Sequence, residues 1–495
     1  MSNSCTGAQA LVFGILDSGV TLATGVPGFP ISGIMELLKD SGMEARWSIN
    51  EKVALEAALG ASAVGRRAVV IVKHVGMNVL ADPLVTSVTH TIGAGLVIIA
   101  GDDPGTQQSQ NEQDSRYYGL LAEVPVFDPC DPAVVYSSMC QAFKLSEEVH
   151  TPVIIRITDR LNNETGFVER TKPEVVEFPT FDRDVWSYTM KGKHQLFHTS
   201  SYPRMQHVSA ESELKVRSER GKKLGIISSG YLSTLVEQII SDGKEDISHL
   251  ALTIVNPLPI KGINCFINRH ERTLVVEESE SVIEHQLSCR GVLGKLTGHI
   301  GYGKVEASDI IQALDKIDWD TITPSISPET IESRGFSRNI CDDCPYHVLY
   351  RVLGTIDIPV AGDLGCSVRT APPPMGVVDL AYSLGSSIAT ATGFDKKGIA
   401  LIGDYGLVHT GLQGLIEAVH HHKDVLVVVL QNTIAALTGG QEVPDMTDVV
   451  RTLVPDTTLL DIENISEPEL ATLLTAELEK SGVSVLLVRG KCTMY

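Results

Sequence analysis

Residues 401–441 read LIGDYGLVHTGLQGLIEAVHHHKDVLVVVLQNTIAALTGGQ, which is the pattern of a strand, a helix, a strand and a loop. A short apolar run, 398–402, ends just before Asp404. Residues 411–419 carry apolar side chains at helical spacing, and 425–430 form an unbroken apolar run, as expected of a strand buried on both faces. A strand–helix–strand crossover is right-handed, so its strands are parallel. The stretch therefore predicts an α/β fold built on a parallel sheet.

Two polar residues follow the carboxyl ends of these predicted strands. Asp404 follows the first strand and Asn432 follows the second. Parallel strands end at one edge of the sheet, where open α/β sheets bind ligands. A carboxylate and an amide oxygen at that edge suit Mg²⁺, which prefers oxygen ligands and completes its shell with phosphate and water. An ordinary buried βαβ unit with an Asp in its loop is the alternative interpretation.

Gly403-Asp404 and Asn432, with 28 positions from Asp404 to Asn432, resemble the signature of thiamine diphosphate enzymes. On that resemblance, the Asp404 and Asn432 side chains and the Ile434 backbone carbonyl would hold Mg²⁺, which would anchor the cofactor diphosphate. Tyr405 stands where the signature usually has Gly.

Composition limits the class of protein. The 495 residues are too many for one core. A net charge of −21 argues against nucleic-acid binding. No apolar run reaches the length of a membrane span, and the N-terminus lacks a basic leader. The nine cysteines are scattered apart from one CxxC, which suits a reducing cytoplasm. We expect a cytoplasmic protein.

A second thiamine-type feature lies near the start of the chain. Glu51 follows Asn50 at the beginning of an Ala-rich helix predicted at 53–64. Thiamine diphosphate enzymes place one buried carboxyl group against the aminopyrimidine ring, and Glu51 matches that position by resemblance. Burial would raise its pKa and keep a proton available. The alternative is an acid that interacts with the helix dipole.

Further segments resemble the α-subunit family of indolepyruvate ferredoxin oxidoreductases, in the 2-oxoacid:ferredoxin oxidoreductase superfamily. They are Thr24–Gly28, Lys73–Asn78, Gly101–Pro104 and Asn111–Tyr118. The resemblance places Gly28 beside the cofactor, Phe29 at a substrate position usually held by Thr, and His74 as a candidate for proton transfer. Lys73 and Arg116 would meet a substrate carboxylate, with a loop-pinning hydrogen bond or ion pair as the alternative for each.

The same resemblance supplies candidates in the last third of the chain. Residues 362–366 match a second glycine-rich loop of the family, with Gly362, Asp363, Gly365 and Cys366 as cofactor-binding candidates. Met375 is the candidate for supporting the bent cofactor, and His409 is a second candidate for proton transfer. For Cys341 and Cys344 we favour a structural helix start over a redox role, because no second CxxC supplies the ligands of a zinc site.

The resemblance divides the chain into four regions. They are a pyrimidine-binding thiamine diphosphate domain at 1–175, a linker region with irregular elements at 176–222, a transketolase C-terminal-like domain at 223–330 and a diphosphate- and Mg²⁺-binding domain at 331–495. We therefore expect a thiamine diphosphate-binding fold of several doubly wound parallel-sheet domains. The first region has short predicted strands at Thr21–Thr24, Ala68–Val72, Gly95–Ala100 and Pro152–Ile157.

The predicted activity is decarboxylation of a 2-oxo acid, with an arylpyruvate such as indolepyruvate implied by resemblance. In the family the reaction is oxidative and involves ferredoxin and coenzyme A. The family's iron–sulfur tail would begin near Lys491–Tyr495, where this sequence stops, so we expect no such cluster in this chain and assign clusters to partner subunits, including a possible β subunit. The small-residue helices suggest a homodimer or hetero-oligomer. The alternatives are a non-oxidative decarboxylase that yields an aldehyde and a catalytically silent scaffold subunit.

Overall fold

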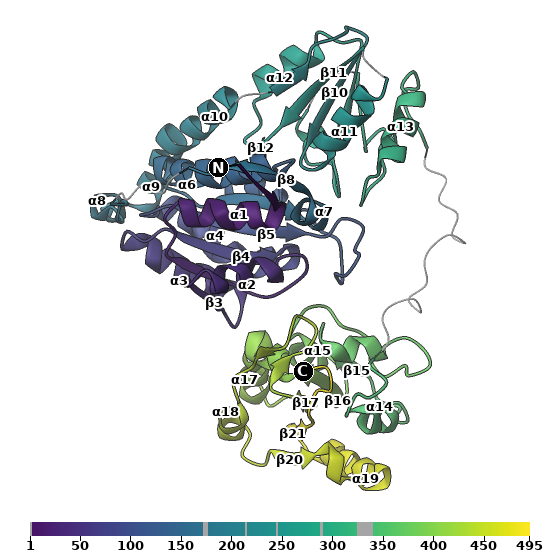
Figure 1. Cartoon of the computed structure of the whole chain (residues 1–495). Helices are drawn as coiled ribbons and strands as arrows, with labels where there is room; N and C mark the ends of the chain where they lie inside the picture. The colour runs from purple at the N-terminus through teal and green to yellow at the C-terminus, as the bar shows by residue number, and fades with distance from the viewer. Residues whose placement is uncertain (1, 172–176, 213–214, 244–245, 288–290, 324–339) are drawn as a thin grey trace. The chain divides into compact units, whose positions relative to one another are not determined.

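The computed structural model describes residues 2–171, 177–212, 215–243, 246–287, 291–323 and 340–495 (Figure 1). The chain forms two compact units, Met1–Ser325 and Ile326–Tyr495. The predicted boundary at 330/331 lies outside the described residues, and the four-region division stays a prediction. None of the described helices is long and apolar enough to cross a membrane.

The first unit begins with a seven-stranded sheet that is parallel except at one edge. Its strands, in spatial order, are β12 (Ile254–Asn256), β6 (Val126–Phe127), β7 (Val153–Thr158), β5 (Leu96–Asp102), β4 (Ala68–Lys73), β2 (Leu22–Gly25) and β3 (Glu44–Trp47). Only β12 runs antiparallel to its neighbour. All four strands predicted from apolar runs are present. The central strands β4, β5 and β7 are buried almost throughout, which explains why their sequences are continuous apolar runs.

Helices cover this sheet on both faces, as the alternating sequence predicts. They are α1 (Gly7–Asp17), α2 (Ser32–Asp40), α3 (Glu51–Ala63), α4 (His74–His90), α5 (Tyr117–Ala122), α6 (Pro132–Val149) and α7 (Asp159–Asn163). Helices α1 and α6 pack together, as do α3 and α4. A short antiparallel pair, β1 (Ser2–Thr6) and β8 (Thr165–Glu169), closes this part of the chain.

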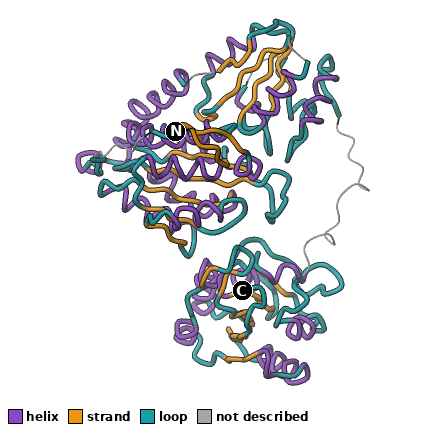
Figure 2. The backbone as a smooth tube through the Cα atoms, in the orientation of Figure 1, coloured by secondary structure: helices purple, strands orange, loops and turns teal. Residues whose placement is uncertain are grey.

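Residues 177–212 differ from the predicted irregular linker. They form α8 (Arg183–Ser187), α9 (Met190–Leu196), the π-helical η1 (Phe197–Ser201) and α10 (Tyr202–Glu211) (Figure 2). Phe197 and Met205 pack into the core of the first sheet, and most other side chains of these helices are exposed. The polar surface hid the helical period in the sequence, because only two residues of the segment needed to be buried deeply.

A five-stranded sheet completes the first unit. Its spatial order is β14 (Val292–Leu293), β13 (Arg272–Val276), β10 (Leu224–Ser229), β11 (Ile247–Leu252) and β9 (Lys215–Ser218), with α11 (Leu232–Ser241), α12 (Ile260–Ile267), the 3₁₀ turn η2 (Glu284–Gln286) and α13 (Ala307–Asp315). Side chains from this sheet join the core of the first sheet, and β12 pairs with β6. The two sheets therefore share one hydrophobic core.

The second unit is a single parallel sheet with one extra hairpin. The sheet order is β15 (Val360–Gly362), β16 (Gly398–Gly403), β17 (Val425–Gln431), β21 (Val483–Arg489) and β20 (Thr458–Asp461). Helices α14 (His347–Leu353) and α19 (Glu467–Glu479) supply one core. Helices α15 (Ser387–Ala391), α17 (Leu412–His420) and α18 (Thr447–Leu453) supply the other.

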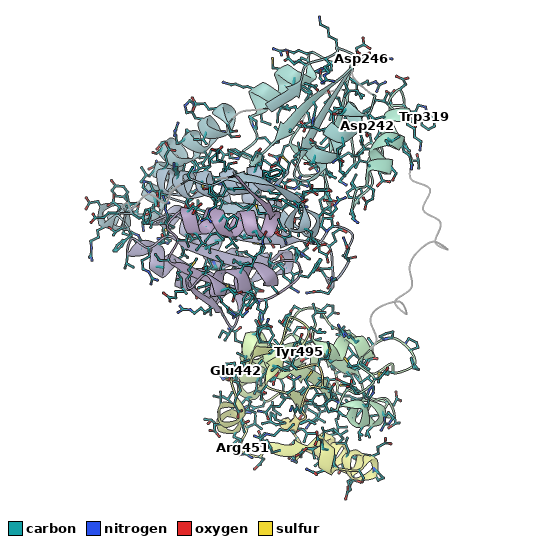
Figure 3. All side chains as sticks on the ribbon, viewed as in Figure 1. Asp242, Asp246, Trp319, Glu442, Arg451 and Tyr495 are labelled. Atoms are coloured by element: carbon teal, nitrogen blue, oxygen red, sulfur yellow. The ribbon has the colours of Figure 1, made fainter. Side chains whose placement is uncertain are left out.

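The strand–helix–strand unit predicted at the outset is present in this sheet. Strands β16 and β17 are parallel, and Gly403 lies opposite Leu430. Between β16 and α17 the chain forms the one-turn α16 (Asp404–Gly406) and the π-helical η6 (Leu407–Gly411), which the helical period did not show. The hairpin of β18 (Ile434–Ala435) and β19 (Gln441–Glu442) follows β17. The ring of Tyr495, labelled in Figure 3 with Glu442, covers Gly440 in that hairpin.

Candidate active site

The second unit joins Asp404 and Asn432 directly. One Asp404 carboxylate oxygen, Oδ2, accepts hydrogen bonds from the N–H groups of Asn432 at 2.9 Å and Thr433 at 2.6 Å. The other oxygen, Oδ1, accepts from the Tyr405 N–H at 2.8 Å. The Ile434 N–H donates to Asn432 Oδ1 at 3.1 Å. The carboxylate therefore clamps the ends of β16 and β17 together, as the parallel arrangement predicts.

The clamp holds a strained backbone. Thr433 has φ of 64°, in the left-handed region that β-branched residues rarely adopt. Its N–H bond to Asp404 and its Oγ1 bond to the Asn432 carbonyl, at 2.7 Å, keep it there. Strain of this kind persists where the surrounding structure enforces it and is concentrated at functional sites. No sequence signal pointed to Thr433.

A cation fits this donor set. Asp404 is only 7% exposed, burial raises its pKa to about 6, and no Lys or Arg among the described residues pairs with it. A buried carboxylate without a counter-charge is unfavourable, and a divalent cation would remove that cost. Within the described part of the chain, no group of three or more His, Cys, Asp and Glu side chains could hold a metal. Any ion would therefore depend on mixed oxygen ligands, as Mg²⁺ does.

Asp363 follows the neighbouring strand β15 and is fully buried. Its Oδ1 accepts from the Gly365 N–H at 3.3 Å and from Ser367 Oγ at 3.1 Å. Its Oδ2 has no hydrogen-bond partner among the described residues, and burial raises the pKa of this carboxyl to about 6. A Cβ added at Gly406 would lie 2.1 Å from Oδ2, so only glycine fits there. The orphaned oxygen is consistent with a bound polar group at this edge.

The other predicted residues of the glycine-rich loop follow Asp363. A Cβ at Gly362 would meet Val378, and Gly365 precedes the 3₁₀ helix η5 (Cys366–Thr370). Burial raises the pKa of the Cys366 thiol to about 12, so it stays protonated at neutral pH. His409 lies in η6, is 5% exposed, and its ring centroid is 6.1 Å from that of Tyr405.

Met375 does not lie at this edge, contrary to prediction. Leu380 pairs in parallel with Ala361 of β15, so the five residues before Leu380 lead away from the carboxyl end of that strand. Met375 lines a cavity of about 700 Å³ together with α14 residues and the start of α19. Its predicted support of the cofactor depended on sequence proximity to the glycine-rich loop, and the chain reverses between the two.

The CxxC has the structural arrangement that the sequence favoured. The Cys341 carbonyl accepts from the Cys344 N–H at 3.1 Å and from His347 Nε2 at 2.7 Å, just before α14. Burial raises the pKa of Cys344 to about 11, and the neighbouring Cys341 and Cys492 thiols add to the shift. These bonds fix the start of α14.

The first unit gathers a second set of predicted residues at the carboxyl ends of β2 and β4. Asn50 caps α3, accepting the Val53 N–H at 2.9 Å, and Glu51 begins the helix with 4% exposure. A Cβ at Gly76 would lie 2.6 Å from Glu51 Oε1, so α4 approaches the carboxyl group at its glycine. Sequence reasoning passed over Gly76, although it lies two residues from His74.

Lys73, Gly28 and Phe29 lie beside Glu51. The Lys73 stem passes over Gly28, where an added Cβ would be 2.6 Å from Lys73 Cδ. Burial lowers the pKa of Lys73, and the carboxylates of Glu51 and Asp103 oppose that shift. Phe29 is half-buried in the next loop position. Glu51, Lys73 and Gly28 thus meet as predicted, with the lysine ammonium near the glutamate carboxyl.

His74 and Arg116 are buried among structural contacts. The His74 ring nitrogens lie 3.2 Å from the Gly101 carbonyl and 2.9 Å from the Asn111 carbonyl. Arg116 is fully buried, donates to both carboxylate oxygens of Asp114 at 2.9 and 2.6 Å, and pairs with Glu277 at 3.1 Å. For both residues the structure has the loop-pinning alternative. The predicted substrate contact of Arg116 is corrected, because its guanidinium is committed to these carboxylates and to the Glu278 carbonyl at 2.8 Å.

The contact between Gly76 and Glu51 can be tested by mutation. We expect Gly76→Ala to lower turnover by about tenfold or more, because a displacement near 1 Å at a reacting group can cost about 100-fold. Gly60→Ala in α3 is the control, since a Cβ there meets nothing within 4 Å and alanine favours a helix. Steady-state rates and thermal melts would compare the two; equal rates in both variants would contradict the contact's importance.

Comparison with known proteins gives independent matches to both parts of the chain. Residues 5–117 match the family model of the N-terminal TPP binding domain of thiamine pyrophosphate enzymes, and residues 363–473 match the model of the C-terminal TPP binding domain. The first range contains Glu51 and Lys73, and the second contains Asp363, Asp404 and Asn432.

Relatives align along most of the chain. The indolepyruvate oxidoreductase subunit IorA of Methanothermobacter marburgensis is 32% identical over 474 residues, covering 89% of this chain and 76% of that protein. The same-named subunit of Archaeoglobus fulgidus is 29% identical, covering 99% and 86%. A solved structure of 2-oxoglutarate:ferredoxin oxidoreductase from Magnetococcus marinus aligns with a TM-score of 0.51 at 14% identity, over 64% of this chain and 65% of that one. At that identity the likeness shows the fold.

Proposed function

Because this chain belongs to the family of the indolepyruvate oxidoreductase subunit IorA, a family of 2-oxoacid oxidoreductases with thiamine diphosphate-binding domains, we propose that it uses Mg²⁺ and thiamine diphosphate to decarboxylate an arylpyruvate oxidatively. The observation that supports the proposal most strongly is the clamp of Asp404 on Asn432 and Thr433, with no cation of the protein at the buried carboxylate.

Each unit contributes its own residues. In the second unit, Asp404, Asn432 and the Ile434 carbonyl would hold Mg²⁺, and Gly362, Asp363, Gly365, Cys366 and Gly403 would lie along the cofactor. When bound, thiamine diphosphate supplies a carbon nucleophile and accepts the electron pair left by departing CO₂. These residues orient the diphosphate and neutralise its charge through the metal.

In the first unit, Glu51 would hold a proton against the aminopyrimidine ring from its buried position at the start of α3. Gly28 would let the ring approach the backbone. Lys73 would bind the substrate carboxylate, and Phe29 would form one wall of the substrate pocket. His74 is left without a chemical role in this proposal, because both ring nitrogens face backbone carbonyls. His409 stays a candidate for moving a proton.

Partner subunits would receive the electrons, and coenzyme A would accept the acyl group, because relatives carry the name of an oxidoreductase subunit. The alternative outcome is protonation in place of oxidation, which would release an aldehyde. A silent scaffold is disfavoured, since it has no chemical use for Glu51, Asp404 and Asn432 together.

The activity can be tested by supplying indolepyruvate and other 2-oxo acids with Mg²⁺, thiamine diphosphate, coenzyme A and a one-electron acceptor dye. We expect CO₂ release that depends on the dye and favours an arylpyruvate. Dye-independent release with an aldehyde product would select the non-oxidative alternative. A folded chain, with its partner subunit added, that binds cofactor but releases no CO₂ from any 2-oxo acid would contradict the proposal.

A further inference from the structure

Lys73 is held by a single neutral acceptor. Its Nζ donates to Gln110 Oε1 at 3.1 Å, and this is the one hydrogen bond of that ammonium to the described residues. An ammonium group has three donors, and a largely buried one gains most from a charged acceptor. Glu51 and Asp103 act on Lys73 electrostatically without a hydrogen bond to it. The lysine is therefore a cation with an incomplete set of partners.

The loop that carries Gln110 is fixed on both sides of that residue. Asp103 accepts hydrogen bonds from the N–H groups of Gln107 at 3.1 Å, Gln108 at 2.9 Å and Ser109 at 2.8 Å. On the other side, the Asn111 carbonyl lies 2.9 Å from His74 Nε2. The backbone before and after Gln110 is thus pinned, and its side chain extends to Lys73. Asp103 and His74 act here as positioning residues.

We propose that Gln110 is a specificity-determining residue, whose amide oxygen occupies on Lys73 the position that the carboxylate of a 2-oxo acid takes when it binds. The inference rests on the proposed function. A carboxylate oxygen is an acceptor of the same kind as the Gln110 amide oxygen but carries charge, so it displaces the amide. A neutral molecule of the same shape offers no such gain, so Gln110 remains on Lys73 and excludes it.

Variants of Gln110 separate this role from simple loop structure. Gln110→Ala removes the competitor, so we expect the KM for an arylpyruvate to fall by about two- to tenfold, the worth of one neutral hydrogen bond. Gln110→Glu supplies a permanent carboxylate to Lys73, so KM should rise by about tenfold or more, as for a hydrogen bond between charged groups. Neither variant touches Glu51, so kcat should change little.

Two controls make the comparison strict. Gln107→Glu adds the same charge three residues earlier, where the structure has only a backbone hydrogen bond, and KM should stay at the wild-type value. The 2-oxo amide of the same arylpyruvate lacks the carboxylate, so its inhibition of turnover should strengthen in Gln110→Ala relative to wild type. Unchanged KM in both Gln110 variants, or an equal rise in Gln107→Glu and Gln110→Glu, would overturn the role of Gln110.

A measurement without turnover decides the contact itself. Acylation of Lys73 by an amine-selective reagent at pH 8, followed by peptide mass spectrometry, should slow by about tenfold in Gln110→Glu, since each pKa unit of added protonation costs about a factor of ten. Equal labelling in wild type, Gln110→Ala and Gln110→Glu would overturn the inference. Failure of the wild-type chain to bind thiamine diphosphate with Mg²⁺ would instead overturn the proposed function, together with the substrate role.

Discussion

Replacing Glu51 with glutamine lowers kcat by about 10²–10⁴-fold and leaves thiamine diphosphate bound, because a positioned acid or base contributes that much to a rate. Glutamine keeps the size of the side chain and its capacity to accept a hydrogen bond but cannot hold the exchangeable proton. The buried position of Glu51 against Gly76 allows no other acid to take its place without a shift of α4.

The control for this variant lies on the same helix. Glu56 is exposed and pairs with Lys52, so Glu56→Gln should leave kcat unchanged. Single-turnover rates and calorimetric cofactor affinity would be measured for both variants. Full turnover by Glu51→Gln would remove the acid from the mechanism; loss of cofactor binding would show that Glu51 supports binding and not chemistry.

Replacing Asp404 with alanine weakens Mg²⁺-dependent binding of thiamine diphosphate by more than about 100-fold, since even outer-shell partners of a metal are worth about 10- to 100-fold. The variant also removes the acceptor of three backbone N–H groups, so it disturbs the Thr433 turn. Asn432→Ala separates the two effects, because its side chain accepts only the Ile434 N–H and the Asp404 clamp stays. Asp456, an exposed acid in the same unit, supplies a control as Asp456→Ala.

The same carboxyl group sets a pH dependence. Burial raises the pKa of Asp404 to about 6, so the ionised form that binds a cation is present above that pH and is lost as the pH falls through it. Wild-type affinity for Mg²⁺ and cofactor should therefore fall below about pH 6, with a lower midpoint at high Mg²⁺ because the metal competes with the proton. Asn432→Ala should retain the trend, and a pH-independent wild-type affinity between pH 5 and 8 would contradict this assignment.

Sequence patterns predicted the parts of the fold that depend on local periodicity. The apolar runs identified β4, β5, β7, β16 and β17, because strands buried on both faces leave no polar alternation. The rule that parallel strands end at one edge brought Asp404 and Asn432 together, and the structure has them in contact. The α/β fold class and the thiamine diphosphate family are confirmed by the matched domains.

The errors arose where the answer depended on tertiary contacts. Arg116 was assigned to substrate because sequence does not show that Asp114, two residues away, and Glu277, far along the chain, would enclose its guanidinium. Met375 was misplaced because the return of residues 377–380 along β15 has no sequence signature. Thr433 was missed because its positive φ is imposed by the Asp404 clamp against its own preference.

The most direct test of the central claim is calorimetric titration of the purified chain with thiamine diphosphate, with Mg²⁺ and with chelator. The account predicts binding in the low micromolar range or tighter, about −8 kcal/mol, that is lost when Mg²⁺ is removed. A folded chain that fails to bind thiamine diphosphate in the presence of Mg²⁺, or that binds it equally well without Mg²⁺, would contradict the assignment of Asp404, Asn432 and Ile434 as the metal ligands.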